Sequence, residues 1–308
     1  MIDRRLLIAG LASGLVSTTV ALPAQAQMTG GGAAPSPSPS LIPPPSSIPP
    51  LSSRPGLAPK RPGAPRWVRN AVVPPRRDGR PIITIVIDDL GVVHPGTERI
   101  MALAAPLTLA WFPFARNLPA QVAEGRARGH EAILHMPMQA TGKTTAWTGP
   151  DPLTTDVSPA ENLRRLQAAL DAVPDTVGLN NHMGSVATLS APLMDIVAAE
   201  AKLRGMLVLD SVTIPHSRVA SQAALIGVPS ASRDLFIDWQ ADPAVIKTQL
   251  ALIEASALRH GSVIAIGHPW PNTLDALEAW VPTLARKGFA LWPLSATVAL
   301  RNEITISV

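Results

Sequence analysis

The sequence Ile-Val-Ile-Asp-Asp-Leu-Gly occupies residues 85–91, and it decides how the rest of the chain is interpreted. Its β-branched residues, with Thr84 before them, predict a strand buried on both faces, as in parallel α/β sheets. Catalytic and ligand-binding groups in such folds lie just past the carboxyl ends of the strands. Asp88 and Asp89 have that position, and two neighbouring carboxylates usually need a positive charge, most often a divalent metal. A helix N-cap is the alternative interpretation of this pair.

Apolar runs with strand character recur after residue 80 and alternate with helical segments. The predicted strands are 82–87, 107–112, 131–135, 177–180, 206–210, 235–237 and 263–267, with 289–291 as an eighth candidate. Helix starts are predicted at Ser158–Glu161, at Asp242-Pro243 for a helix to about Leu258, and at Asn272-Thr273 for a helix to about Arg286. Strands that alternate with helices favour a parallel sheet, and this number of units favours closure into a small barrel.

The first 26 residues have the pattern of an export signal. Arg4-Arg5 precede an apolar stretch that runs to Leu22, and Ala24-Gln25-Ala26 forms a small-x-small cleavage site. This pattern predicts a periplasmic or secreted protein, and the arginine pair also fits the twin-arginine route.

Residues 27–80 are predicted to be a disordered linker, because they are rich in Pro and Ser and then basic. This segment contains eight Lys and Arg residues and one acid, Asp78, so it is more basic than the whole chain, whose net charge is +4. The folded part must therefore carry a negative net charge. The basic charge therefore gives no indication of nucleic-acid binding by the folded part. The linker is instead expected either to contact an anionic envelope surface or simply to be solvated.

Residues 81–308 are predicted to form one catalytic domain, and nothing in the sequence indicates its oligomeric state. The chain has no cysteine, which excludes disulfides, thiolate metal sites and a cysteine nucleophile. Gly-x-Ser-x-Gly, Gly-x-Gly-x-x-Gly and P-loop motifs are also absent from the sequence. A transition metal would have to be held by His and carboxylate side chains.

Polar residues follow the predicted strands at the ends that a parallel barrel brings to one face. They are Asp88-Asp89, His135, Asn180–Ser185, Asp210-Ser211 and His268. Each has a structural alternative, such as a hydrogen-bonded His or a loop cap. Together, two carboxylates and three imidazoles favour a zinc-type site. Such a site lowers the pKa of bound water, while a free carboxylate accepts its proton and a further His protonates a leaving group.

These residues resemble the divergent branch of the polysaccharide deacetylase superfamily. The resemblance spans nearly all of 82–296 and is carried by the segments 85–91, 129–138, 177–185, 209–211 and 265–269. It implies a distorted (β/α) barrel of about seven parallel strands and metal-dependent deacetylation of acetylated polysaccharides. By position, Asp88 resembles the catalytic base, Asp89 the metal-binding Asp, His135 the first ligand His and His268 the catalytic acid.

Two departures from that pattern concern the metal and the substrate. The second ligand His would fall at Gln139, a poor zinc ligand, and we expect His182 on the neighbouring strand to replace it. The segment Asn180–Ser185 takes the place of the superfamily's groove-shaping loop. Substrate contacts are therefore predicted for Asn181, Ser185, Asp210 and Trp270, with Trp270 either stacking on a sugar or packing at the barrel mouth.

The sequence thus supports two functions. The first is a zinc-dependent hydrolase that deacetylates an N- or O-acetylated glycan or related envelope polymer. The second, motivated by Gln139 and the long Pro-rich segment, is an inactive glycan-binding or scaffolding protein on the same barrel. A metal hydrolase that acts on a peptide or phosphoester is a third alternative.

Overall fold

The computed structural model describes residues 63–92, 94–103, 106–142 and 148–305. The predicted export signal and residues 27–62 of the predicted linker lie outside these ranges.

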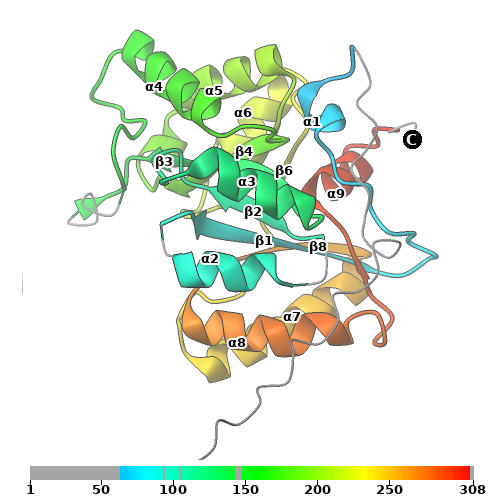
Figure 1. The fold of residues 1–308 in the computed structure, drawn as a ribbon. Helices are drawn as coiled ribbons and strands as arrows, with labels where there is room; N and C mark the ends of the chain where they lie inside the picture. Colours follow the sequence, from blue (N-terminus) through cyan, green and yellow to red (C-terminus); the bar gives the residue numbers. More distant parts are fainter. Residues whose placement is uncertain (1–62, 93, 104–105, 143–147, 306–308) are drawn as a thin grey trace, which may run out of the picture. The chain divides into compact units, whose positions relative to one another are not determined.

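Within the described residues, nine parallel strands form one curled sheet (Figure 1). They are β1 (Ile82–Leu90), β2 (Thr108–Trp111), β3 (Glu131–Met138), β4 (Gly178–Met183), β5 (Leu207–Asp210), β6 (Ser230–Ser232), β7 (Leu235–Phe236), β8 (Ser262–Gly267) and β9 (Ala290–Leu291). Their order is β6-β5-β4-β3-β2-β1-β8-β7, and β9 pairs with the start of β1. The edge strands β6 and β7 are joined by Arg233-Asp234 alone, so the sheet must curl until its edges meet. The predicted distorted parallel barrel is therefore confirmed.

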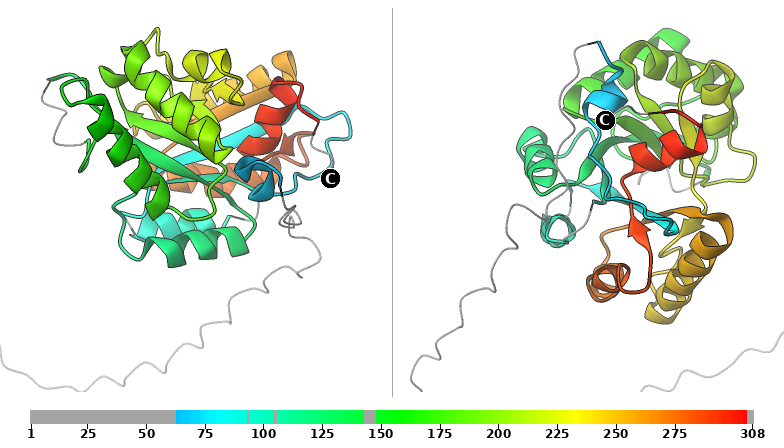
Figure 2. Two further views of the ribbon diagram at one scale, coloured as in Figure 1. Left: turned by 90° about the horizontal axis from the view of Figure 1, so that it is seen from above. Right: turned by 90° about the vertical axis from the view of Figure 1, so that its right-hand side faces the viewer.

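Helices cover the outside of this sheet (Figures 1 and 2). They are α2 (His94–Met101), α3 (Leu118–Ala127), α4 (Pro159–Ala172), α5 (Ala191–Arg204), α6 (Val219–Leu225), α7 (Pro243–His260) and α8 (Pro271–Trp280). Short 3₁₀ helices η3 (Ala187–Leu189) and η4 (Val281–Thr283) precede α5 and follow α8. No helix among the described residues has the length and apolar character needed to cross a membrane.

Local sequence signals fix most of the helix boundaries. Ser158 Oγ accepts a hydrogen bond from the Glu161 amide, and Asp242 caps α7 in the same way. The predicted helix from Asn272 to about Arg286 was wrong at both ends. The helix begins earlier, because Pro271 takes the first helical position, and it ends as α-helix at Trp280.

Two apolar layers hold the barrel together. The outer layer lies between the sheet and the helices and includes Ile85 and Ile87 of β1. The inner layer fills the barrel with alternate residues such as Val86. At the amino ends of the strands, α9 (Leu294–Arg301) and Trp67 complete this inner layer.

The predicted linker was too long, because residues 63–80 are part of the fold. Helix α1 (Arg66–Arg69) places Trp67 in the inner layer, where it is only 3% exposed. The Asn70 side chain donates to the carbonyl of Thr176 at 3.0 Å, and Trp292 Nε1 donates to Pro75 O at 2.8 Å. The Pro-rich, basic composition hid this role, because only Trp67, Ala71 and Val72 supply buried apolar side chains among residues 63–80.

Replacing Trp67 should therefore destabilise the whole barrel. We expect Trp67→Ala to lower the free energy of unfolding by about 3–5 kcal/mol, as for other buried aromatic residues. Urea unfolding of the full chain measures this change. Trp239→Ala is the control, because Trp239 is 56% exposed. Equal effects of the two substitutions would contradict the packing of residues 63–80.

Candidate active site

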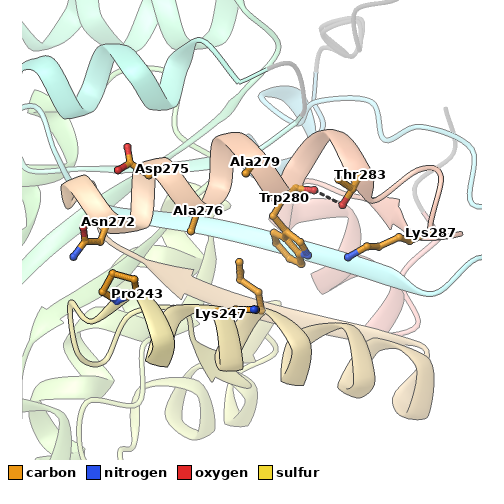
Figure 3. Close-up of a pocket in the computed structure, with 10 residues that line it drawn as sticks. Pro243, Lys247, Asn272, Asp275, Ala276, Ala279, Trp280, Thr283 and Lys287 are labelled. Atoms are coloured by element: carbon orange, nitrogen blue, oxygen red, sulfur yellow. Dashed lines mark hydrogen bonds between the residues drawn. The ribbon is translucent and has the colours of Figure 1, made fainter.

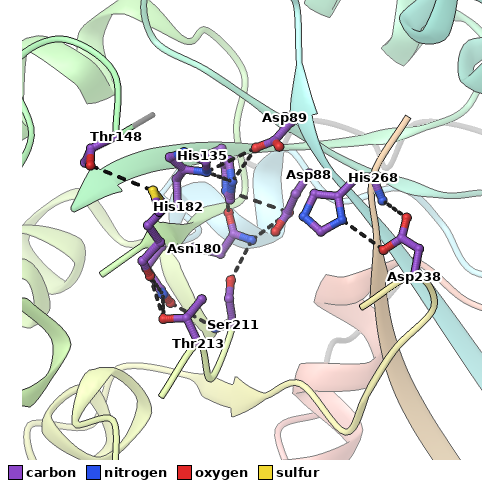
Figure 4. Close-up of polar contacts among 12 residues, drawn as sticks. Asp88, Asp89, His135, Thr148, Asn180, His182, Ser211, Thr213, Asp238 and His268 are labelled. Carbon is purple, nitrogen blue, oxygen red and sulfur yellow. Dashed lines mark hydrogen bonds and ion pairs between the residues drawn. The ribbon is translucent and has the colours of Figure 1, made fainter. Parts of the chain in front are cut away.

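Strand alternation brings polar residues to the mouth of the barrel. On four strands, the polar residue lies two positions beyond an inner-layer apolar residue: Asp88 after Val86, His135 after Ile133, Ser211 after Leu209 and His268 after Ile266. Because side chains two apart in a strand share a face, all four point into the same space. Figure 4 shows this cluster, with Asp88 lying between the His135–Asn180 pair and His268.

Three of the predicted ligands, Asp89, His135 and His182, meet at one point of the mouth, which we call the ligand point. Asp89 Oδ1 lies 3.2 Å from His135 Nε2 and 3.1 Å from His182 Nδ1, and the two ring nitrogens are 3.1 Å apart. Ligand atoms on a tetrahedral zinc ion lie about 3.3–3.5 Å from one another, given metal–ligand distances of about 2.0–2.2 Å. The three atoms therefore have nearly the spacing of one face of such a site.

The register between β3 and β4 explains why His182 takes part and Gln139 does not. His135 pairs with Asn180, and Pro137 pairs with His182, so His182 lies diagonally across from His135 on the same face. Both strands run past the predicted ends at 135 and 180. Gln139 is turned away, and its Oε1 accepts hydrogen bonds from the amide and hydroxyl of Thr155.

Asn180 fixes the hydrogen-bonding state of His135. Asn180 Nδ2 donates to Asp88 Oδ1 at 2.8 Å, so Asn180 Oδ1 must face His135 and accept from its Nδ1 at 2.8 Å. A neutral His135 then carries no proton on Nε2 and directs a lone pair at the ligand point.

The ligand point is suited to hold a positive charge. Asp89 Oδ1 is buried and accepts no hydrogen bond from any described residue, although two ring nitrogens lie within 3.2 Å. Burial opposes its ionisation, yet His135 and His182 lower the pKa of the Asp89 carboxyl well below its usual range. Burial also opposes the charge on His135, but Asp88 and Asp89 raise the pKa of this imidazole. Either a proton or a metal ion can balance these groups, and the two-His, one-Asp donor set fits zinc.

An irregularity near the end of β1 lets the two adjacent carboxylates point in different directions. The pairing of β1 with β2 shifts register between Ile87 and Leu90, and Asp89 has a left-handed φ of 61°. Such backbone is uncommon for a residue other than glycine, and it is often found at functional sites. It lets Asp88 point into the barrel while Asp89 reaches the ligand point. Burial raises the pKa of the Asp88 carboxyl, which improves it as a proton acceptor.

Across the mouth, His268 is paired with a carboxylate that the sequence analysis missed. His268 Nδ1 donates to Asp238 Oδ1 at 2.9 Å, and Asp238 Oδ2 accepts from the His268 amide and from Thr273 Oγ1, each at 2.7 Å. Burial would lower the pKa of His268, but the fully buried Asp238 raises it to about 9. His268 is therefore a proton donor at neutral pH. Asp238 directly follows the predicted strand 235–237, so the strand-end rule could have found it.

Aromatic rings line the mouth on both sides. Trp270 stacks on His268 with ring centroids 4.7 Å apart, and it remains partly exposed. On the other side, the Phe112 ring lies 5.2 Å from His135 and 4.8 Å from His182. These rings restrict the rotamers of the three imidazoles and exclude water from their sides.

Asp210 forms hydrogen bonds within the loop that follows β5, and its contact with substrate stays a prediction. It is buried, and its Oδ1 accepts from the Val212 amide and from Ser217 Oγ, while Oδ2 accepts from the Ala220 amide. These bonds organise the loop after β5, which corresponds to the cap alternative for this residue.

Asn181 and Ser185 are likewise engaged within the protein. Asn181 is buried, donates to Met183 O at 2.8 Å and accepts from the Ser211 amide at 2.9 Å. Ser185 Oγ accepts from the Thr141 amide at 2.9 Å. The amide group of Asn181 thus joins the β4 and β5 loops, and its contact with substrate stays a prediction. Ser185 bonds to the loop that follows β3, whereas the residues of the polar cluster lie at the ends of the strands.

A second hollow, of about 520 Å³, lies between α7 and α8 and is separate from the mouth (Figure 3). Its lining includes Trp280 and Lys287, which both donate to Glu254. No residue of the mouth cluster lines it. Among the described residues, the group of His and carboxylate side chains that could hold a metal ion lies at the barrel mouth.

Known sequences match most of the folded region. A family model described as divergent polysaccharide deacetylase matches residues 85–298. An uncharacterized protein of Haemophilus influenzae is 34% identical over 202 residues, which are 66% of this chain and 71% of that protein. YibQ, an uncharacterized protein of Escherichia coli, is 32% identical over 202 residues, which are 66% of this chain and 63% of YibQ.

A solved structure agrees with the barrel. An uncharacterized protein of Agrobacterium tumefaciens superposes with a TM-score of 0.71 at 23% identity, over 76% of this chain and 95% of that one. At this identity the likeness concerns the fold alone.

The charge on His268 should depend on Asp238. We expect Asp238→Asn to lower the pKa of His268 from about 9 to its ordinary value near about 6.5 or below, as NMR titration of the imidazole will show. Since the folded pKa exceeds the unfolded one, this pair stabilises the protein fully below about pH 6.5 and loses its effect as the pH rises through about 9. Asp275→Asn, at an exposed acid, should leave the His268 titration unchanged. An unchanged titration in Asp238→Asn would contradict the pairing.

Asn180 should control how strongly the ligand point holds a metal. Asn180→Leu removes the acceptor for His135 Nδ1, so we expect a changed imidazole tautomer by ¹⁵N NMR and zinc binding weaker by about 10–100-fold. Asn162→Leu is the matched control, because the Asn162 side chain is also buried but bonds only to Thr154 among the described residues. Equal zinc affinities in the two variants would show that Asn180 does not act on His135.

Proposed function

Because the chain belongs to the divergent polysaccharide deacetylase family, we propose that it is a metal-dependent hydrolase that removes acetyl groups from a polysaccharide of the cell envelope. One observation carries this proposal: a two-His, one-Asp ligand point shares the barrel mouth with a buried carboxylate, Asp88, and with the imidazole of His268, whose pKa is raised to about 9. Amide or ester hydrolysis needs this arrangement, because one group must take a proton from water and another must give one to the leaving atom.

Asp89, His135 and His182 would hold the cation, most suitably zinc. When bound there, the cation would lower the pKa of a water molecule and polarise the acyl carbonyl. Asp88 accepts the proton of the attacking water, and its position is held by Asn180. His268 donates its proton to the departing nitrogen or oxygen of the sugar, while Asp238 keeps it charged and oriented. Trp270, stacked on His268, offers a partly exposed ring against which a sugar can pack.

The proposal includes export of the protein to the envelope. It rests on the signal-like sequence of residues 1–26, and a periplasmic or secreted location would place the barrel beside acetylated glycans.

Glycan binding without turnover is the second candidate function. The observation that favours it is Gln139, which stands where the superfamily has a ligand His and is bonded to Thr155 instead. A protein of this kind would bind acetylated glycans equally well with or without a chelator.

Metal content separates the two functions. The purified full chain should contain one zinc or similar ion, which Asp89→Ala and His182→Ala should lose by elemental analysis. Gln139→Ala is the matched control and should keep the ion, because Gln139 is turned away from the ligand point. A parent protein that stays empty after dialysis against zinc would exclude the hydrolase.

Turnover supplies the second test. Acetate release should be followed with an oligomer of N-acetylglucosamine and with O-acetylated xylan. Asp88→Asn should keep the metal but lower kcat by about 10²–10⁴-fold, since it removes the proton acceptor. Metal-loaded protein that binds these glycans without releasing acetate would favour the binding function.

A further inference from the structure

The end of the barrel opposite the mouth carries exposed leucines. In a parallel β/α arrangement, helices end where the strands begin, so the last turns of the helices gather at this end. Leu203 of α5, Leu225 of α6 and Leu258 of α7 all lie in such last turns and are 79%, 76% and 66% exposed. Leu300, in the last turn of α9, is also exposed. Single exposed leucines are ordinary, but one from each of four helices at the same end is a pattern.

Contacts between the helix ends place these leucines on one continuous surface. Lys202 Nζ donates to Ile226 O at 2.7 Å and joins the ends of α5 and α6. Asn302 Nδ2 donates to Ser230 O at 2.9 Å, which joins the end of α9 to the segment after α6. Arg301 Nε donates to Ser262 Oγ at 3.2 Å, which joins the end of α9 to the start of β8, just after α7.

A basic segment crosses the same end. We call residues 66–80 the strap; it begins beside Gly205, which ends α5, and its Arg77 lies beside Gly261, which ends α7. It carries five arginines and one acid, Asp78. The right-hand view of Figure 2 shows the strap (cyan) and α9 (red) on the face turned towards the viewer.

Positive charge on this end is largely unbalanced. Arg69, Arg76, Lys202 and Arg259 are exposed and form no ion pair with any described residue. The acids Asp78, Asp171 and Asp234 are each paired with an arginine, namely Arg80, Arg204 and Arg301. Asp175 and Glu303 form no ion pair with any described residue. Three exposed arginines without an ion pair, together with Lys202, whose Nζ bonds to the Ile226 carbonyl, therefore lie at the same end as the exposed leucines.

We propose that this leucine-and-arginine end of the barrel docks on an anionic phospholipid surface. A protein partner would require a contiguous apolar centre depleted of charge, whereas these leucines stand apart among cations. Alternating leucine and basic side chains suit the lipid interface, where the apolar groups enter the acyl boundary and the cations remain among the phosphates. Docking in this way directs the barrel mouth away from the bilayer. The proposal does not depend on the proposed catalytic function.

The absence of cysteine from the chain makes a direct test possible. Single cysteines are placed in the full chain by Leu225→Cys and Leu258→Cys and labelled with a dye whose emission shifts to the blue in an apolar environment. Leu189→Cys is the matched control, because Leu189 is exposed in η3 at the mouth end. The probes are vesicles of phosphatidylglycerol and phosphatidylcholine in equal parts, vesicles of phosphatidylcholine alone, and soluble polyphosphate.

We expect a blue shift at positions 225 and 258 with the phosphatidylglycerol vesicles only, and none at position 189. No shift at 225 and 258, or an equal shift at 189, overturns the proposal. An equal response to polyphosphate also overturns it and identifies a soluble polyanion as the partner instead.

Charge removal gives an independent measurement on the same vesicles. Arg69→Gln and Arg76→Gln should each weaken binding by about fivefold in co-sedimentation at low salt. Arg116→Gln, at an exposed arginine beyond β2 near the mouth, should leave binding unchanged. All variants share the same residues 1–62, so any binding by that segment is constant. Equal effects of the three substitutions would show that the strap does not face the lipid.

Discussion

The parallel register between β3 and β4 is the constraint on which the site depends. Pairing His135 with Asn180, and Pro137 with His182, puts two imidazoles and one amide on the inner face of neighbouring strands. A slip of one residue would turn all of them outward, because side chains alternate along a strand. The register also explains how a second imidazole reaches the ligand point although residue 139 is Gln rather than His. The second imidazole comes from the neighbouring strand rather than from four residues further along the same one.

Charge then determines what this arrangement can hold. Asp89, His135 and His182 bring one carboxylate oxygen and two ring nitrogens to one point, where a cation or a shared proton can be held among them. Neighbouring residues fix the orientation and protonation of the reactive groups. Asn180 orients Asp88 and His135 by hydrogen bonds, and Asp238 keeps His268 protonated. The proposed base, Asp88, is thus held by an amide, whereas the proposed acid, His268, is held by a carboxylate. That difference would separate their roles at neutral pH.

The two ends of the barrel have opposite characters. The mouth gathers carboxylates, imidazoles and aromatic rings, and the amino ends of the strands are closed by Trp67 and α9. On the outside of this end, which Trp67 and α9 plug, lie exposed leucines and arginines that form no ion pair with any described residue. A barrel that docks by its plugged end would present its mouth to a polymer, so the two proposals are compatible, although each is tested separately.

The sequence alone determined the parallel barrel and most strand and helix positions, because alternation and strand-end position are properties of the chain itself. For the same reason it predicted that Asp88, Asp89, His135, His182 and His268 would lie together at the barrel mouth. Tertiary structure decided the rest. Asp238 was missed, although it also follows a predicted strand, since only the fold shows that it bonds His268. Asn181 and Asp210 were predicted to contact substrate, and the fold shows in addition that both form hydrogen bonds that organise the loops after β4 and β5. The composition of residues 63–80 predicted a linker, yet Trp67 in this segment is buried in the barrel. A hydrogen-bond partner or a burial site distant in the chain leaves no local pattern, so only the folded protein reveals it.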